Sequence, residues 1–222
     1  MRIVESQSNS WSASGRGWAA VLGLLLALAG VACGGLPKIH YYTLPIPPPP
    51  EAGDPKTNLI LGVEPFRAVE VLRDDRIVYF ESPTQLNFYE YHRWSSNPAT
   101  MLTDLTIRRM NMLGEFAGVR ILPSRAPVDY VLRGRLLNFD EVDFDAQVKG
   151  RVVLELSLLR SRDNALVWSG IRQAESVAEG KGVPAVASAL SAASGQLLDA
   201  TLPLLVAAVE RDVQRGSNAS PQ

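Results

Sequence analysis

The sequence contains one cysteine and two histidines, so few of its residues can act as nucleophiles or soft metal ligands. Cys33 has no second cysteine with which to form an intramolecular disulfide, and its thiol is therefore available for modification. His40 and His92 lie far apart in the sequence. Together with Cys33 they fall short of the four ligands that a structural zinc site usually takes. We therefore predict no disulfide and no Cys/His metal centre. Cys33 is the residue whose side chain is best suited to covalent modification.

A short acidic run is the other place where side chains could hold a ligand. It consists of Asp140, Glu141, Asp143 and Asp145. The run lacks the glycine and the twelfth-position glutamate of an EF-hand loop. We predict a solvated strand end or turn, with no metal and no cofactor.

The sequence offers little for catalysis. Neither histidine accompanies a nucleophile motif such as G-x-S-x-G. The Gly-Lys pair in 180–182 lacks the spacing of a phosphate-binding loop, so we predict that the chain does not hydrolyse ATP. Catalysis by a pair of carboxylates is an open alternative, but no feature of the sequence singles out one such pair. We predict that the protein is not an enzyme, and a periplasmic hydrolase is the weakest alternative.

An apolar run precedes Cys33. It extends over 15 residues, 18–32, and follows a polar start that carries Arg2 and Arg16. A membrane-spanning helix needs about 20 apolar residues. A basic start, a short apolar run and small residues at its end are typical of a secretory signal peptide. We therefore predict that residues 1–32 are removed by cleavage between Ala32 and Cys33.

The four residues Gly30-Val31-Ala32-Cys33 resemble the lipobox of bacterial lipoproteins, although Gly30 stands where leucine is usual. The resemblance implies that Cys33 carries fatty acyl chains such as palmitate, and three chains make release from the membrane negligible. Gly35, rather than aspartate, two residues after the cysteine implies the periplasmic face of the outer membrane. A secreted protein with an unpaired thiol and a protein anchored by an uncut helix are the alternatives.

Residues 33–57 form the predicted tether. Its proline block, 47–50, favours a stiff polyproline II segment. The apolar patch Ile39–Leu44 inside the tether has two interpretations. It is either an edge strand that docks on the domain or on a neighbouring copy, or a lightly packed arm.

The domain follows over 58–213, and 214–222 is a polar tail that we expect to be disordered. The apolar spacing predicts strands over 58–66, 76–81, 85–94, 119–122, 129–139, 148–160 and 166–176, and helices over 98–115 and 184–213. Asn97 and Pro98 favour a helix start, Gly118 helps to end that first helix, and Pro203 should kink or break the second. We predict an α+β fold with a largely antiparallel sheet of about six to seven strands covered by two helices.

The lipobox and five segments that follow it, in this order, resemble the ABC-type transport auxiliary lipoprotein family. The five segments are Tyr41-Tyr42-Thr43-Leu44, Val63-Glu64-Pro65, Arg76-Ile77-Val78-Tyr79, Tyr91-His92-Arg93-Trp94 and Asp129-Tyr130-Val131-Leu132-Arg133-Gly134. The resemblance extends from about Cys33 to about Val213. It implies an outer-membrane partner of a lipid or solvent transport system that contains an MCE-domain protein, with a permease and an ATPase as indirect partners. Self-association of copies is left open.

Tyr89, Tyr91, Arg93 and Trp94 form the predicted partner interface, because tyrosine, tryptophan and arginine dominate interface hot spots. The alternative places Trp94 in the core at a strand–helix junction and the tyrosines on a half-buried strand. A net charge of −1 gives no long-range attraction to nucleic acid, so we predict no nucleic-acid partner. A structural or regulatory envelope lipoprotein, such as a cofactor of cell-wall synthesis, is the alternative function.

Overall fold

The computed structural model describes residues 37–48, 54–144 and 147–218. The predicted signal peptide, Ala32, Cys33 and part of the predicted tail lie outside the described residues. The chain divides into two units between Lys38 and Ile39, and the fold is that of the second unit. Its strands and helices are, in chain order, β1 (His40–Tyr42), β2 (Ile60–Val63), β3 (Arg67–Ala68), the 3-10 turn η1 (Glu70–Leu72), β4 (Arg76–Ser82), β5 (Gln85–Trp94), α2 (Pro98–Leu113), β6 (Gly118–Ile121), β7 (Tyr130–Val142), β8 (Lys149–Arg160), β9 (Ala165–Val177) and α3 (Val183–Asn218).

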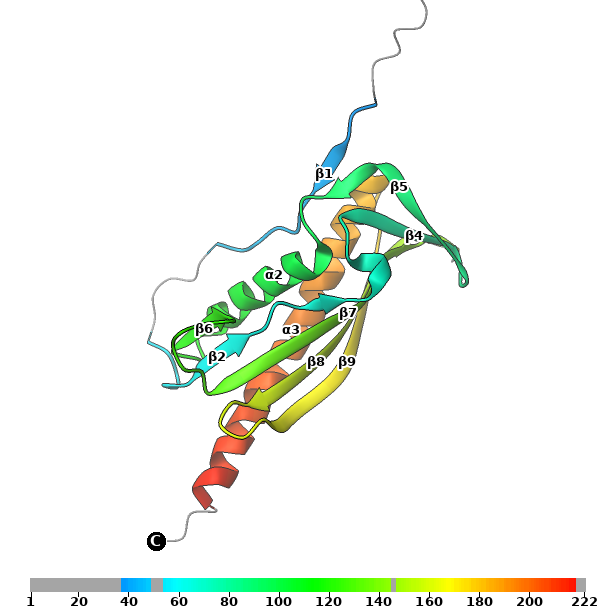
Figure 1. The fold of residues 1–222 in the computed structure, drawn as a ribbon. Coiled ribbons are helices and arrows are strands. Elements are labelled where there is room, and N and C mark those ends of the chain that lie inside the picture. Colours follow the sequence, from blue (N-terminus) through cyan, green and yellow to red (C-terminus); the bar gives the residue numbers. More distant parts are fainter. Residues whose placement is uncertain (1–36, 49–53, 145–146, 219–222) are drawn as a thin grey trace, which may run out of the picture. The chain divides into compact units, whose positions relative to one another are not determined.

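Within the described ranges, all nine strands belong to one mixed sheet (Figure 1). The pairs β4–β5, β7–β8 and β8–β9 are antiparallel. The pairs β1–β5 and β2–β6 are parallel, and so are the pairings of β2, β3 and β4 with β7. The α+β class and the two helices are confirmed. The prediction of a largely antiparallel sheet with six to seven strands was wrong, because the sheet is mixed and has more strands.

The long strand β7 explains the mixture. One of its edges pairs with β8, and the other pairs in turn with β2, β3 and β4. Parallel neighbours need a crossover connection of a dozen or more residues, and here β5, α2 and β6 lie between β4 and β7. Hairpins are visible in a sequence because their turns are local. A crossover pairing leaves no local signal, so the parallel part of the sheet was missed.

The two helices close over one face of this sheet, and their ends follow from single residues. α2 begins as predicted, because the Asn97 side chain accepts a hydrogen bond from the Ala99 N–H at 2.8 Å. It ends before Gly118, the glycine that we expected to help end it. Gly114 adopts a left-handed φ of 65°, which terminates the helix at that point.

α3 continues without a break through Pro203. The proline is exposed, whereas Leu202 and Leu205 on either side of it are buried in the core. Tertiary packing of the buried stripe therefore holds the helix together despite the missing backbone donor. The predicted break was wrong, and the helix also includes residues 214–218, which we had assigned to a disordered tail.

Among the described helices, α3 alone is long and apolar enough to cross a membrane. The most apolar stretch of α3 is 56% buried inside the fold, and its buried residues contribute to the main hydrophobic core. In Figure 1, β7 and β8 run across α3. We therefore assign α3 to the core of the domain.

Helix α3 packs closely on β8 at Gly150. A Cβ atom at this position would lie 2.6 Å from the backbone nitrogen of Leu190 on α3. We expect Gly150→Ala to push α3 away from the sheet and to lower the free energy of unfolding by about 1–3 kcal/mol. Chemical denaturation of the purified protein measures this change.

Gly118→Ala is the matched control, because a Cβ atom there would meet Ile60 at an ordinary 3.6 Å. An equal loss of stability in both variants would contradict a close contact at Gly150.

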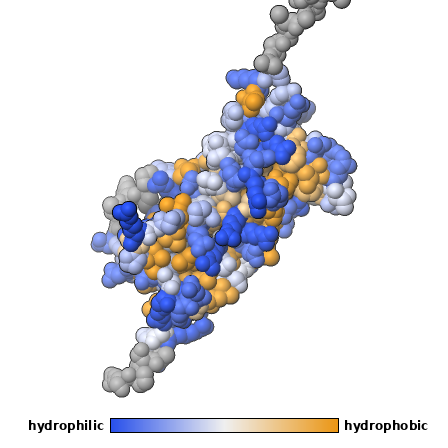
Figure 2. All heavy atoms as spheres, viewed as in Figure 1, coloured by the Kyte–Doolittle hydropathy of each residue, from blue (hydrophilic) through white to orange (hydrophobic). Residues whose placement is uncertain are grey.

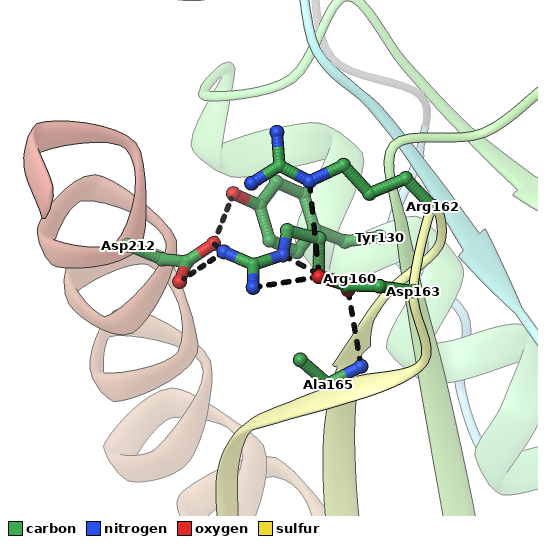
Figure 3. A network of polar contacts seen from close by, with 6 residues as sticks. All are labelled: Tyr130, Arg160, Arg162, Asp163, Ala165 and Asp212. Atoms are coloured by element: carbon green, nitrogen blue, oxygen red, sulfur yellow. Dashed lines mark hydrogen bonds and ion pairs between the residues drawn. The ribbon is translucent and has the colours of Figure 1, made fainter. Parts of the chain in front are cut away.

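A polar network joins the C-terminal part of α3 to the sheet (Figure 3). The Arg160 guanidinium on β8 contacts Asp163 at 2.9 Å and Asp212 of α3 at 3.0 Å. The Tyr130 hydroxyl donates to Asp212 at 3.0 Å. Burial, followed by the Asp212 hydrogen bond, raises the pKa of Tyr130 to about 12, so this hydroxyl keeps its proton and remains a donor. The network therefore joins β7, the β8–β9 turn and α3.

Candidate partner-binding surface

The segment before the proline block is part of the sheet. β1 pairs in parallel with β5, with His40 opposite His92 and Tyr42 opposite Trp94. Leu44, just after β1, is 2% exposed and belongs to the core. Of the two interpretations of the apolar patch, the structure shows the edge strand, and this strand docks on its own domain.

An aromatic stack forms where β1 meets β5. The rings of His40 and His92 stack with their centroids 5.2 Å apart, and Tyr42 packs on His92 at 5.7 Å. The Tyr42 hydroxyl and His92 Nδ1 form a hydrogen bond of 2.9 Å. Burial, helped by the nearby His40, lowers the pKa of His92. His92 is therefore neutral at physiological pH and acts in the stack as a structural residue.

The buried carboxylate of Glu141 is linked to this stack through Tyr89, whose ring meets His92 edge-on at a centroid distance of 5.9 Å. Tyr89 packs on Tyr79 with a centroid distance of 4.7 Å, and its hydroxyl donates to Glu141 Oε2 at 2.7 Å. Burial raises the pKa of Glu141, although the Tyr89 hydrogen bond opposes this. Burial and the same hydrogen bond raise the pKa of Tyr89, so Tyr89 stays protonated as the donor. The pair fixes the β5 backbone to the end of β7.

The neighbouring carboxylate, Asp140, is also buried. It is 1% exposed and accepts hydrogen bonds from Arg151 at 2.9 Å and from Asn138 at 2.8 Å. Burial raises the pKa of Asp140, and both partners oppose the rise. The prediction of a solvated strand end was therefore wrong for Asp140 and for Glu141. β7 extends beyond the predicted end at Phe139 and carries both carboxylates into the sheet.

The buried state of Glu141 predicts a dependence of stability on pH. Since its pKa is raised on folding, the native state binds more protons than the unfolded chain between the ordinary and the raised value. Stability contributed by this group is therefore lost as the pH rises through that window. We expect Glu141→Gln to be stabilised relative to the wild type, by a margin that grows from pH 4 to neutrality in denaturation experiments.

Tyr89→Phe is the complementary variant. It leaves the carboxylate buried without its donor, so it should cost more stability at neutral pH than at pH 4. A stability difference that stays constant with pH in both variants would show that folding does not shift the pKa of Glu141.

The four predicted interface residues have different environments. Trp94 is fully buried and packs edge-on against Phe139 with a centroid distance of 5.0 Å. Its proposed role as a surface anchor was therefore wrong, since alternation along β5 does not reveal which face the helices cover. Arg93 is partly buried and lies 3.5 Å from Asp75, Tyr89 is half-buried, and Tyr91 is 38% exposed.

The exposed aromatic surface at this edge comes from both strands. Tyr41 is 64% exposed and pairs with Arg93, two residues from Tyr91, so Tyr41 and Tyr91 share a face of the β1–β5 pair. Ile39, which is 43% exposed, precedes β1 on the same alternation. We call Ile39, Tyr41 and Tyr91 the β1–β5 surface. Only Tyr91 was predicted as an interface residue, although the apolar patch 39–44 already indicated the other two.

The arrangement is suited to docking. Tyr41 and Tyr91 provide exposed aromatic contact area on the face opposite the stack, and the ring contacts of the stack hold β1 on β5. In the described part of the chain, no three His, Cys, Asp or Glu residues gather in a way that could hold a metal ion.

Comparisons with known proteins agree with this fold. Residues 42–201 match the family model described as ABC-type transport auxiliary lipoprotein component. A crystal structure of a Xanthomonas campestris protein covers 79% of this chain and 99% of its own at 22% identity, with a TM-score of 0.71. The crystal structure of another protein covers 76% of this chain and 99% of its own at 16% identity, with a TM-score of 0.61. No curated protein matches the sequence. Both structures share the fold of this chain.

Proposed function

Because the chain belongs to the ABC-type transport auxiliary lipoprotein family, we propose that it is the outer-membrane-anchored component of an MCE-type lipid or solvent transport system. In this role the lipid on Cys33 holds the protein at the periplasmic face, and the domain docks on the periplasmic MCE protein. The chain catalyses no reaction itself, and the energy comes from the ATPase that acts on the permease.

One observation supports the docking role: the exposed β1–β5 surface begins only a few residues after the proposed anchor, Cys33. Cys33 precedes His40 of β1 by seven residues. A chain of this length spans at most about 25 Å when fully extended. The proline block follows β1, so it does not lengthen the connection between the lipid and the first strand. A lipid on Cys33 would therefore keep the β1–β5 surface near the membrane, where the outer end of a periplasm-spanning partner would arrive.

Affinity purification tests this proposal. The intact tagged lipoprotein is purified from detergent-solubilised envelope, and its proteins and lipids are identified by mass spectrometry. We expect the MCE protein to copurify with the wild type. We expect its recovery to fall about tenfold or more in the Tyr41→Ala/Tyr91→Ala double variant, as truncation of two hot-spot side chains would cause.

The control is Leu166→Ala/Ile171→Ala, which removes two exposed side chains of β9 that are 62% and 58% exposed. The control should retain the partner, and thermal unfolding should show that both double variants are folded. Recovery of a peptidoglycan synthase without any MCE protein would contradict the proposal and support the envelope-lipoprotein alternative.

A further inference from the structure

The face of the sheet that the helices leave uncovered carries a cluster of arginines. Arg133 and Arg135 alternate along β7 with the buried Leu132 and Leu136, so both arginines point away from the core. Arg67 of β3 is the register partner of Arg135, and all three arginines are exposed. Figure 2 shows a band of hydrophilic residues across this region between hydrophobic areas.

Two glutamates balance the charges of this cluster only in part, since Glu64 and Glu155 line the same hollow as the three arginines. Glu64 contacts Arg133 at 2.9 Å. Glu155 is the register partner of Arg135 on the other side. Among the residues that the structure describes, Arg67 and Arg135 form no ion pair within 4.0 Å of a carboxylate. Arg67 and Arg135 are directly opposite each other in the sheet, and like charges in that arrangement destabilise it.

The cluster lines a hollow. Its volume is about 430 Å³, and Ser157 of β8 contributes a hydroxyl to its wall. Pro65 lies at the gap between β2 and β3, where the ladder along β7 is interrupted. A second hollow of about 530 Å³ adjoins the first at Arg67 and is lined by Leu122 and Pro123. The two hollows share Glu64, Pro65 and Arg67, and Leu122 and Pro123 add apolar side chains to the wall of the second.

We propose that the arginine hollow binds a phosphate-type oxyanion. Arg67 and Arg135 each present a planar set of N–H donors, which matches the spacing of phosphate oxygens, and an anion between them removes their mutual repulsion. The Ser157 hydroxyl supplies a further donor at the wall. The anion is either a free phosphate or the phosphoryl headgroup of a lipid, whose apolar part would lie along Leu122 and Pro123. The site is separate from the β1–β5 surface and does not depend on docking.

Calorimetric titration of the detergent-solubilised full-length lipoprotein tests the site. Three probes are used: inorganic phosphate, dihexanoyl phosphatidylglycerol and dihexanoyl phosphatidylcholine, with both lipids below their micelle concentrations. We expect saturable binding of at least one of these three probes, each of which contains a phosphate group. The Arg67→Gln/Arg135→Gln variant should weaken that binding by about 10- to 100-fold, because two charged hydrogen-bonding groups are lost.

Arg211→Gln/Arg215→Gln removes the same net charge from the exposed end of α3 and serves as the control. It should bind as the wild type does. In the absence of ligand, the hollow variant should melt at a temperature no lower than the wild type, because its replacements relieve repulsion. Tight binding of phosphate alone would identify a free anion, and tight binding of phosphatidylglycerol alone a lipid headgroup. Equal binding by the hollow variant and the control, or no saturable binding of any probe, would overturn the proposal.

Discussion

A Cys33→Ser variant is expected to lose acyl labelling completely and to disappear from the outer-membrane fraction. In the proposed anchor the Cys33 thiol accepts the diacylglyceryl chain, and serine offers no thiolate in its place. Each buried methylene of an acyl chain contributes about 0.8 kcal/mol to membrane binding, so loss of the lipid removes the anchor entirely. Incorporation of labelled palmitate, together with density separation of the membranes, measures both effects.

The matched control is Gly30→Leu, which gives the lipobox its usual leucine and should keep the label. Retained labelling of the Cys33→Ser variant would contradict lipidation at this residue. The finding of mature wild-type protein free in the periplasm with an unmodified thiol would contradict it as well.

Replacement of Trp94 by alanine is expected to cause the largest loss of stability of any single change considered for this fold. Trp94 is fully buried at the junction of β5 and α2 and packs against Phe139. Deletion of a buried tryptophan side chain costs about 3–5 kcal/mol, a large part of the stability of a typical domain. Urea denaturation followed by circular dichroism measures the change.

Trp94→Phe separates packing from polarity. The Trp94 indole N–H is buried and has no hydrogen-bond acceptor among the described residues. Phenylalanine removes this unpaired donor and keeps an aromatic ring against Phe139, so its cost should be clearly smaller than that of alanine. A stable Trp94→Ala protein that has lost its partner would instead restore the surface role that we first assigned to this residue.

The local elements were accessible from the sequence. The strand Gln85–Trp94 has the predicted bounds, because its alternation and flanking turns are local signals. The start of α2 followed from the Asn97-Pro98 pair in the same way. The parallel pairing of β2, β3 and β4 with β7 was not accessible, because it joins residues that a helix and two strands separate along the chain.

The candidate site shows the same division between local and distant contacts. The exposed aromatic character of β5 was visible, but its two faces could not be told apart, so both a surface position and a core position of Trp94 stayed open; the structure shows the core position. Glu141 was placed in water because an acidic run at a strand end is usually solvated. Its burial depends on the Tyr89 hydroxyl, which comes from another strand. Recognition of that pair requires the β4–β5 and β4–β7 registers together.

Site-specific photocrosslinking in living cells is the most direct test of docking through the β1–β5 surface. A photoreactive amino acid is placed at Tyr41 or Tyr91, and at the exposed Gln214 on the last turns of α3 as a control. The proposal predicts adducts with the MCE protein at Tyr41 and Tyr91 and none at Gln214. Adducts with the MCE protein at Gln214 alone, or adducts at Tyr41 and Tyr91 only with proteins of cell-wall synthesis, would contradict it.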